Sequence, residues 1–252
     1  MQSQLTKRFS TKTGIVLLML LFMSFIVPQP KITIWMIGDS TMAKKEAKAY
    51  PETGWGMELG NFFDNSVLIE NRGLNGRSTK SFINENHWQP VLDNIKEGDY
   101  VFIEFGHNDE KIDKPSVGTS IEVFKSNLVR FVLETRGKGG IPVLLTPITR
   151  RSFKEGTLTE THGLYPAATI SVADSLKVPL IDMLAKSKKV VADLGDEPSK
   201  ALYNYVEAGD VNYPNGKKDD THLSPVGAKK IASLAVQGVV ELKLDLAKRL
   251  LK

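Results

Sequence analysis

The chain lacks cysteine altogether and has only four histidines among its 252 residues. The absence of cysteine excludes disulfide bonds, thiolate metal sites, cysteine nucleophiles and a lipid-modified N-terminal cysteine. An excess of charge of one sign is also missing, because 33 basic residues face 29 acidic ones and the formal net charge is +4. Three basic residues, Lys7, Arg8 and Lys12, lie in the first 28 residues, which contain no acid, so the rest carries only +1. We therefore predict no nucleic-acid partner.

A hydrophobic run long enough to span a membrane is missing as well. The uncharged apolar run from residue 14 to residue 27 is shorter than the ~18 residues that indicate a transmembrane helix. It follows a basic start, which is the pattern of an export signal. No small-residue cleavage site precedes Pro28, so a cleaved signal peptide and an uncleaved anchor both stay open for residues 1–28. We predict an exported protein, periplasmic or extracellular, with membrane contact only through such an anchor and one domain over residues 29–252.

Short apolar runs alternate with longer amphipathic ones in the rest of the chain. Strands are predicted at residues 32–37, 67–70, 100–105, 142–145 and 179–181, and helices at 54–63, 88–95, 119–136, 165–175, 183–193 and 225 to about 250. The third and fourth strand candidates are continuous apolar runs, as in strands buried on both faces. This alternation predicts an α/β fold with a parallel sheet and helices on both sides. Long loops are predicted at residues 150–163 and 203–222.

Polar residues follow the predicted strands at the points where those strands end. The first strand is followed by Gly-Asp-Ser-Thr at residues 38–41, the second by NRGLNGRS at 71–78, and the third by GHND at 106–109. A fourth polar group, DDTH at 219–222, precedes the last predicted helix. Ligands bind beyond the carboxyl ends of the strands in such a sheet. We therefore expect these four groups to share one functional edge.

Ser40 and His222 are the residues with which an acyl-transfer site would begin. A serine hydroxyl is a poor nucleophile unless a base takes its proton and a third group orients that base. Asp219 lies three residues before His222, so in a turn it can hold Nδ1–H and leave Nε2 free for Ser40. Alternatively, Ser40 caps a helix, and DDTH is a solvated turn or a pair of metal ligands.

Gly76 and Asn108 are candidates for the donors that stabilise a developing oxyanion. A glycine can present its backbone N–H unshielded, and an asparagine after a buried strand can present its side-chain amide. Each of the two, taken singly, also fits an ordinary turn residue. Their occurrence after neighbouring strands, together with Ser40 and His222, favours an acyl-transfer site.

The four polar groups, in this order, resemble the conserved blocks of the SGNH or GDSL hydrolases. Five motifs are similar to those of the rhamnogalacturonan acetylesterases, namely GDSTMA, GWG, NGRSTKSF, GDYVFIEFGHND and DDTHLSPVGA. TPITRRSF, THGLYP and VPLIDM resemble the bacterial members of that group. The resemblance covers residues 32–230, which is nearly the whole predicted domain.

This resemblance implies a flavodoxin-like three-layer α/β/α sandwich with a five-stranded parallel sheet. It makes Ser40 the nucleophile, His222 the general base and Asp219 the residue that orients it. The Ser40 N–H, the Gly76 N–H and the Asn108 side chain would form the oxyanion hole. No metal and no cofactor are implied. The implied reaction is removal of acetyl groups from the galacturonic-acid-containing backbone of pectin.

A polyanionic substrate would suit cations around the cleft. Arg77, Lys80, Arg150 and Arg151 lie on the predicted loops, and His162 lies in the loop after the fourth strand, so contact with an acetylated polysaccharide is predicted for Arg77, Arg150 and His162. Each of them can equally be a solvated or loop-ordering side chain.

Two other functions stay open: an esterase of the same fold acting on xylan, another acyl sugar or a lipid, and a catalytically silent carbohydrate-binding protein.

Overall fold

The protein is built on a five-stranded parallel sheet. A computed structural model describes residues 30–251, and the predicted leader at residues 1–28 lies outside the described residues. The strand order is β2-β1-β3-β4-β7, which confirms the predicted α/β class and the parallel sheet. The strands are β1 (Ile32–Gly38), β2 (Val67–Asn71), β3 (Tyr100–Glu104), β4 (Ile141–Leu145) and β7 (Leu180–Ile181).

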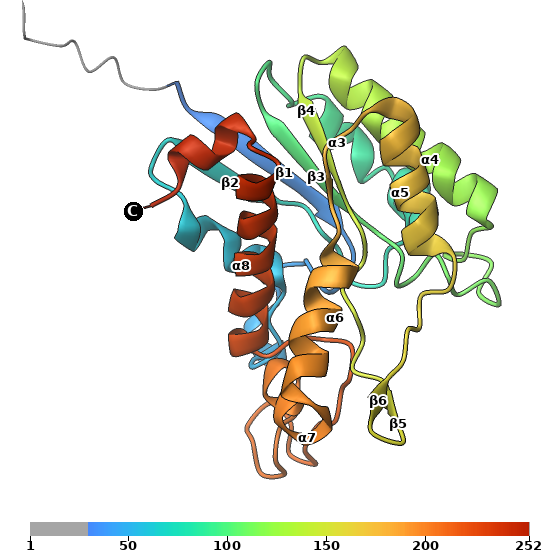
Figure 1. Cartoon of the computed structure of the whole chain (residues 1–252), viewed down its shortest axis with the longest axis vertical. Coiled ribbons are helices and arrows are strands. Elements are labelled where there is room, and N and C mark those ends of the chain that lie inside the picture. Colours follow the sequence, from blue (N-terminus) through green and yellow to red (C-terminus); the bar gives the residue numbers. More distant parts are fainter. Residues whose placement is uncertain (1–29, 252) are drawn as a thin grey trace, which may run out of the picture. The chain divides into compact units, whose positions relative to one another are not determined.

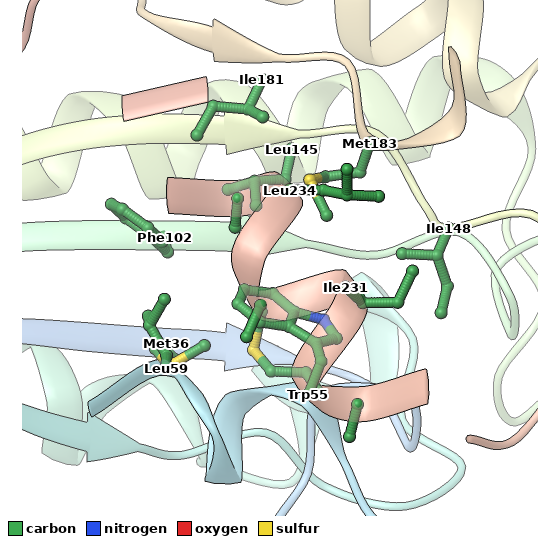
Figure 2. Close-up of a cluster of buried hydrophobic side chains, with 14 of the residues drawn as sticks. Met36, Trp55, Leu59, Phe102, Leu145, Ile148, Ile181, Met183, Ile231 and Leu234 are labelled. Atoms are coloured by element: carbon green, nitrogen blue, oxygen red, sulfur yellow. The ribbon is translucent and has the colours of Figure 1, made fainter. Parts of the chain in front are cut away.

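Both faces of the sheet are covered, which explains why the strands are continuously apolar. Side chains alternate between the faces of a strand. Accordingly, Ile34 and Met36 of β1 belong to one hydrophobic core, whereas Trp35 and Ile37 belong to the other. Figure 2 shows part of the first core, which contains Met36 and Phe102 of the sheet together with Leu59 and Trp55.

Helices pack on both faces and complete three layers (Figure 1). The helices against the core that contains Trp35 are α2 (Thr79–Asn84), α3 (Trp88–Leu92), α4 (Ile121–Gly137) and α5 (Tyr165–Leu176). The opposite core is covered by α6 (Met183–Leu194), α8 (Pro225–Glu241) and the 3₁₀ helices η2 (Trp55–Met57) and η3 (Leu59–Phe62). This arrangement confirms the predicted sandwich.

The segment predicted as one helix at residues 54–63 is the two short 3₁₀ helices η2 and η3, so that prediction was wrong. The segment lies against the turn that follows β1, where Trp55 N–H donates to the Thr41 carbonyl at 2.9 Å. A Cβ atom at Gly54 would lie 1.9 Å from the Ala43 carbonyl oxygen. Backbone packed this closely follows its neighbours, and its glycines weaken the helical propensity.

The C-terminal helix is also shorter than predicted. α8 ends at Glu241, the left-handed residue Lys243 (φ 53°) reverses the chain, and η5 (Asp245–Arg249) follows. The short elements η1 (Ala47–Ala49), α7 (Asp196–Ser199), η4 (Lys200–Leu202) and α2 were not predicted, nor was the hairpin of β5 (Phe153–Lys154) and β6 (Thr157–Leu158) inside the predicted loop 150–163. Among residues 30–251, no helix combines the length and apolarity that crossing a bilayer requires.

Candidate active site

Ser40 lies in a tight turn directly after the inner strand β1. The preceding residue, Asp39, ends the strand by accepting hydrogen bonds from the Thr41 N–H and hydroxyl group, both at 2.9 Å. Its carbonyl also accepts from the N–H groups of Met42 and Ala43. The turn is therefore fixed by Asp39 on both its side chain and its backbone, and Ser40 is held at the carboxyl edge of the sheet.

Ser40, His222 and Asp219 form one hydrogen-bonded chain. The Ser40 Oγ lies 2.9 Å from His222 Nε2, and His222 Nδ1 lies 2.8 Å from Asp219 Oδ2. Ser40 comes from the turn after β1, whereas the other two residues come from the loop before α8. The sequence prediction placed these three side chains together, and the structure brings them together.

The loop itself orients Asp219. Its second carboxylate oxygen, Oδ1, accepts from the backbone N–H groups of Thr221 at 2.9 Å and His222 at 3.0 Å. Burial acts to raise the pKa of Asp219, but these hydrogen bonds and the one to the imidazole outweigh it and hold the pKa well below its usual range. Asp219 therefore stays ionised at neutral pH and faces the Nδ1 side of the ring.

Asp220 points to a different set of partners. Its Oδ1 accepts from Arg151 Nη1 at 2.7 Å and from the Tyr205 hydroxyl at 2.6 Å. The predicted distinction between the two neighbouring aspartates therefore has a geometric basis, because only Asp219 is hydrogen-bonded to His222.

The three N–H groups predicted as oxyanion donors, those of Ser40, Gly76 and Asn108, lie in the loops that follow β1, β2 and β3. In the described part of the chain, neither the Ser40 N–H nor the Gly76 N–H donates to a protein acceptor. Gly76 has φ +76°, a conformation that favours glycine. The Asn108 Nδ2 donates to the Arg77 carbonyl at 3.0 Å, and its Oδ1 accepts from Lys111. These two hydrogen bonds orient the Asn108 amide toward the loop that carries Gly76. The second N–H of the amide has no protein acceptor among the described residues.

Asp109 ties the loops after β2 and β3 to each other. Its carboxylate accepts from the Thr79 hydroxyl at 2.6 Å, from the Thr79 N–H and from the Thr119 hydroxyl at 3.1 Å. Burial raises the pKa of Asp109 to about 7 although these hydrogen bonds act against it. The last residue of GHND thus fixes the start of α2 and, with it, the loop that carries Gly76.

His107, the histidine of GHND, belongs to a second Asp–His pair that sequence reasoning missed. Its Nδ1 lies 3.2 Å from Asp39 Oδ2, and both side chains are buried. Burial lowers the pKa of His107 to about 4 even though the Asp39 carboxylate acts to raise it. Its Nε2 is buried without a hydrogen-bond partner among the described residues. The ring packs edge-on against His162, with 4.6 Å between centroids.

His162 is 1% exposed, and both of its ring nitrogens face partners. Nδ1 lies 2.9 Å from Glu110 Oε2, and Nε2 lies 2.9 Å from the Ile148 carbonyl. The ring therefore has no free nitrogen with which to contact a sugar, contrary to the sequence-based expectation.

Arg150 is paired with the same Glu110 at 2.5 Å and lines a surface groove. Contact with substrate through Arg150 stays a prediction.

Glu104, at the end of β3, is a buried acid that the sequence analysis also missed. It is 0% exposed, and its carboxyl accepts from Trp55 Nε1 at 2.5 Å and from the Ile148 N–H at 3.3 Å. Thr41 lies 3.4 Å away and connects it to Asp39. Burial and the negative charge of Asp39 raise the pKa of Glu104 to about 8.

The other predicted cations differ in how accessible they are. Arg77 is partly exposed, pairs with Glu85 at 2.8 Å and lines a groove next to Gly76. Lys80 is directed to the Pro115 carbonyl at 2.6 Å. Arg151 is only 7% exposed and is held by Asp196 and Asp220, so it orders the loop that bears the catalytic candidates. Among the described residues, no three His, Asp or Glu side chains are grouped as metal ligands.

Comparison with known proteins adds a family to this geometry. The GDSL-like Lipase/Acylhydrolase family model matches residues 36–230. Rhamnogalacturonan acetylesterase RhgT of Bacillus subtilis is 39% identical over 217 residues, which are 85% of this chain and 92% of that protein. The probable rhamnogalacturonan acetylesterase YesY of the same organism is 31% identical over 220 residues, which are 87% of this chain and 97% of that protein.

Solved structures share the fold. YxiM from Bacillus subtilis superposes with a TM-score of 0.73 at 26% identity, over 85% of this chain but only 58% of that longer protein. The acetylxylan esterase Axe2 from Geobacillus stearothermophilus superposes with a TM-score of 0.60 at 19% identity, over 83% of this chain and 94% of that protein. The second likeness is one of fold alone.

The parallel sandwich with a serine, a histidine and an aspartate at its carboxyl edge defines a serine hydrolase. The family match extends over most of the chain and includes all of these residues. The chain belongs to the GDSL-like lipase/acylhydrolase family and is a carboxylic ester hydrolase.

Proposed function

We propose that this enzyme removes acetyl groups from rhamnogalacturonan, using Ser40 as nucleophile, His222 as general base and Asp219 as the residue that orients His222. The observation that carries the chemistry is the hydrogen-bonded chain from Ser40 Oγ through the imidazole to the Asp219 carboxylate. The choice of polysaccharide is supported by the 39% identity to a rhamnogalacturonan acetylesterase over 85% of the chain.

The first half of the reaction forms an acetyl-enzyme. His222 Nε2 accepts the hydroxyl proton of Ser40 as Oγ attacks the acetyl carbonyl carbon, and the carbonyl oxygen becomes an oxyanion. The ionised Asp219 stabilises the imidazolium that forms. When the tetrahedral intermediate collapses, the bond from the carbonyl carbon to the sugar oxygen breaks. The imidazolium then returns its proton to that oxygen.

The second half releases acetate. Water enters where the sugar has left, gives a proton to His222 and attacks the acetyl carbon, and Oγ leaves with the proton returned by the imidazole. The oxyanion of both halves would be received by the N–H groups of Ser40 and Gly76 and by the Asn108 amide. A single donor of this kind contributes about 3 kcal/mol to lowering the barrier.

The function is tested by acetate release from acetylated rhamnogalacturonan and acetylated xylan side by side. We expect a higher kcat/KM on rhamnogalacturonan, and the Ser40→Ala variant, prepared identically, measures any contaminating esterase. Faster release from xylan would replace the proposed substrate but keep the chemistry. A protein that released acetate from neither polymer nor from a small acetyl ester would be a silent binding protein.

We further propose that residues 1–28 direct export of the protein. The proposal is supported by the basic start, with Lys7, Arg8 and Lys12, and by the apolar run at residues 14–27. The full chain should appear outside the cytoplasm of a bacterial host, and N-terminal sequencing of that material distinguishes a cleaved signal from a retained anchor. Retention of the protein in the cytoplasm would contradict export.

A further inference from the structure

A groove of about 470 Å³ adjoins the loop that carries Gly76. Asn75 and Arg77, the two neighbours of Gly76, line it on one side, and Ala43 and Lys44, just after the Ser40 turn, line it on the other. We call it the Lys44 groove; Lys48 also lines it. Ala43 and Lys44 follow Ser40 by three and four residues, so the groove lies beside the turn that carries Ser40.

The walls of the Lys44 groove are fixed relative to Ser40. The Leu74 N–H donates to the Gly38 carbonyl at 3.0 Å, which joins the loop after β2 to the end of β1. Lys45, whose side chain is buried, donates to Asn75 Oδ1 at 2.8 Å and pairs with Glu52 at 2.6 Å. A subsite formed by these walls is therefore prearranged, so binding there costs little ordering of the protein.

The Lys44 groove is positively charged. Three cationic side chains line it, Lys44, Lys48 and Arg77, against the single acid Glu46. Lys44 is exposed and has no ion-pair partner among the described residues. Lys48 pairs with Glu46 in full exposure to water, where such a pair is weak and exchanges readily.

A second groove, lined in part by Lys218 and Asp220 from the loop before α8, has balanced charges. It holds about 920 Å³ and is lined by Arg150, Arg151, Lys200 and Lys218 together with four acids, Asp196, Glu197, Glu207 and Asp220. Arg151 is saturated by two of those acids. The side chains that line the Lys44 groove therefore carry a net charge of +2, whereas those that line the second groove carry a net charge of zero, with Lys218 as its one cation without an ion-pair partner among the described residues. A polyanion is attracted more strongly to the Lys44 groove.

We propose that the Lys44 groove is a subsite for the carboxylate of a uronate unit in the acetylated polysaccharide chain, with Lys44 as its main contact. A carboxylate beside an ammonium group forms a charge-assisted hydrogen bond, which is stronger than one between neutral groups. The inference rests on the proposed function in one respect, namely that the acetylated substrate is a uronate-containing polysaccharide.

Inhibition of a small acetyl ester's hydrolysis by unacetylated oligogalacturonate tests the subsite directly. The Lys44→Gln variant should raise the inhibition constant about fivefold, and the difference should shrink in about 0.5 M NaCl. The matched control is Lys138→Gln, because Lys138 is also exposed and unpaired within the described residues but precedes β4 at the opposite edge of the sheet. This variant loses the same charge, so it should keep the wild-type inhibition constant.

Equal inhibition constants for Lys44→Gln and the wild type, or equal changes in both variants, would overturn the subsite. The result does not depend on deacetylation of the polymer, because the small ester reports on binding. Failure of the proposed function is seen separately, as a wild-type enzyme that leaves acetylated rhamnogalacturonan untouched. With rhamnogalacturonan as substrate, Lys44→Gln should increase KM more than it lowers kcat.

Discussion

The protein contains two Asp–His pairs that look alike at one nitrogen and differ at the other. In both, a carboxylate oxygen faces Nδ1, at 2.8 Å in Asp219–His222 and 3.2 Å in Asp39–His107. The His222 side chain is 28% exposed and its Nε2 meets the Ser40 hydroxyl. The His107 side chain is 3% exposed and its Nε2 has no partner within the described residues.

The difference shows that an aspartate on Nδ1 does not make a histidine a catalytic base. Proton transfer also needs a donor at Nε2 and room for the substrate on that side. His107 has neither, and burial holds its ring neutral by lowering its pKa to about 4. The Asp39–His107 pair instead stabilises the Ser40 turn, because Asp39 is also the residue that fixes that turn.

Removing the Ser40 hydroxyl, which only the Asp219–His222 pair contacts, should have the largest effect on kcat. Ser40→Ala leaves His222 Nε2 without a partner, as in His107, and abolishes the acetyl-enzyme. We expect kcat on a small acetyl ester to fall by about 10⁶, as for the nucleophile of a well-studied serine hydrolase. Circular dichroism should show an unchanged fold. Activity above about a thousandth of wild type would remove Ser40 from the mechanism.

Asp219→Asn should cause the second-largest loss of kcat. The amide has nearly the shape of the carboxylate but favours the wrong tautomer of His222. We expect kcat to fall by about 10⁴. The matched control is Asp220→Asn, which loses only contacts to Arg151 and Tyr205 and should keep kcat within about tenfold of wild type. Both variants are measured on one small acetyl ester at neutral pH. The reverse order would transfer the orienting role to Asp220.

His107→Leu should affect stability more than chemistry. It leaves the Asp39 carboxylate buried without the hydrogen bond from the neutral imidazole, so the free energy of unfolding should fall by about 3 kcal/mol. His87→Leu is the control, because His87 is partly exposed and its pair with Glu85 contributes little. Urea unfolding measures stability, and kcat of the folded enzyme should fall far less than in Asp219→Asn. Normal stability with a lost kcat would make His107 a catalytic group.

The smallest effect concerns Glu104, whose pKa is raised to about 8 by burial and by the charge of Asp39. Between its ordinary pKa of 4.5 and this value, the folded protein holds a proton that the unfolded chain has lost. This group's contribution to stability therefore falls as the pH rises through that window. Glu104→Gln cannot titrate, so its Tm should decline less than that of the wild type between about pH 5 and pH 9. Parallel declines would contradict a protonated Glu104.

Sequence alone was sufficient where the determinants are local. Each strand is a short apolar run ended by polar residues, and the Asp219–His222 pair is set by a spacing of three within one turn. The distinction between Asp219 and Asp220 could be predicted for the same reason. The motifs shared with the resembled family supported the prediction of Gly76 and Asn108 as donors. The structure places these two residues on adjoining loops, each with an N–H that has no protein acceptor among the described residues.

The remaining features depend on contacts between distant segments. Asp39 and His107 are 68 residues apart, and Trp55 and Glu104 are 49 apart, so no local pattern reveals either pair. The motif GHND suggested Asn108 but gave no reason to expect that its histidine would be buried. The broken segment at η2 and η3 likewise depends on the close approach of Gly54 to Ala43.

The separation of Ser40 from His222 by 182 residues has a consequence for how the enzyme comes into being. The nucleophile is synthesised 182 residues before its base, which stands immediately before α8. A nascent or truncated chain that ends before this loop carries a serine without a base and is inert. Ester hydrolysis is thus a signal that synthesis has passed the loop of Asp219 and His222. A chain divided before the Asp219 loop would regain activity only when its two pieces reassociate, which makes this fold a ready reporter of fragment assembly.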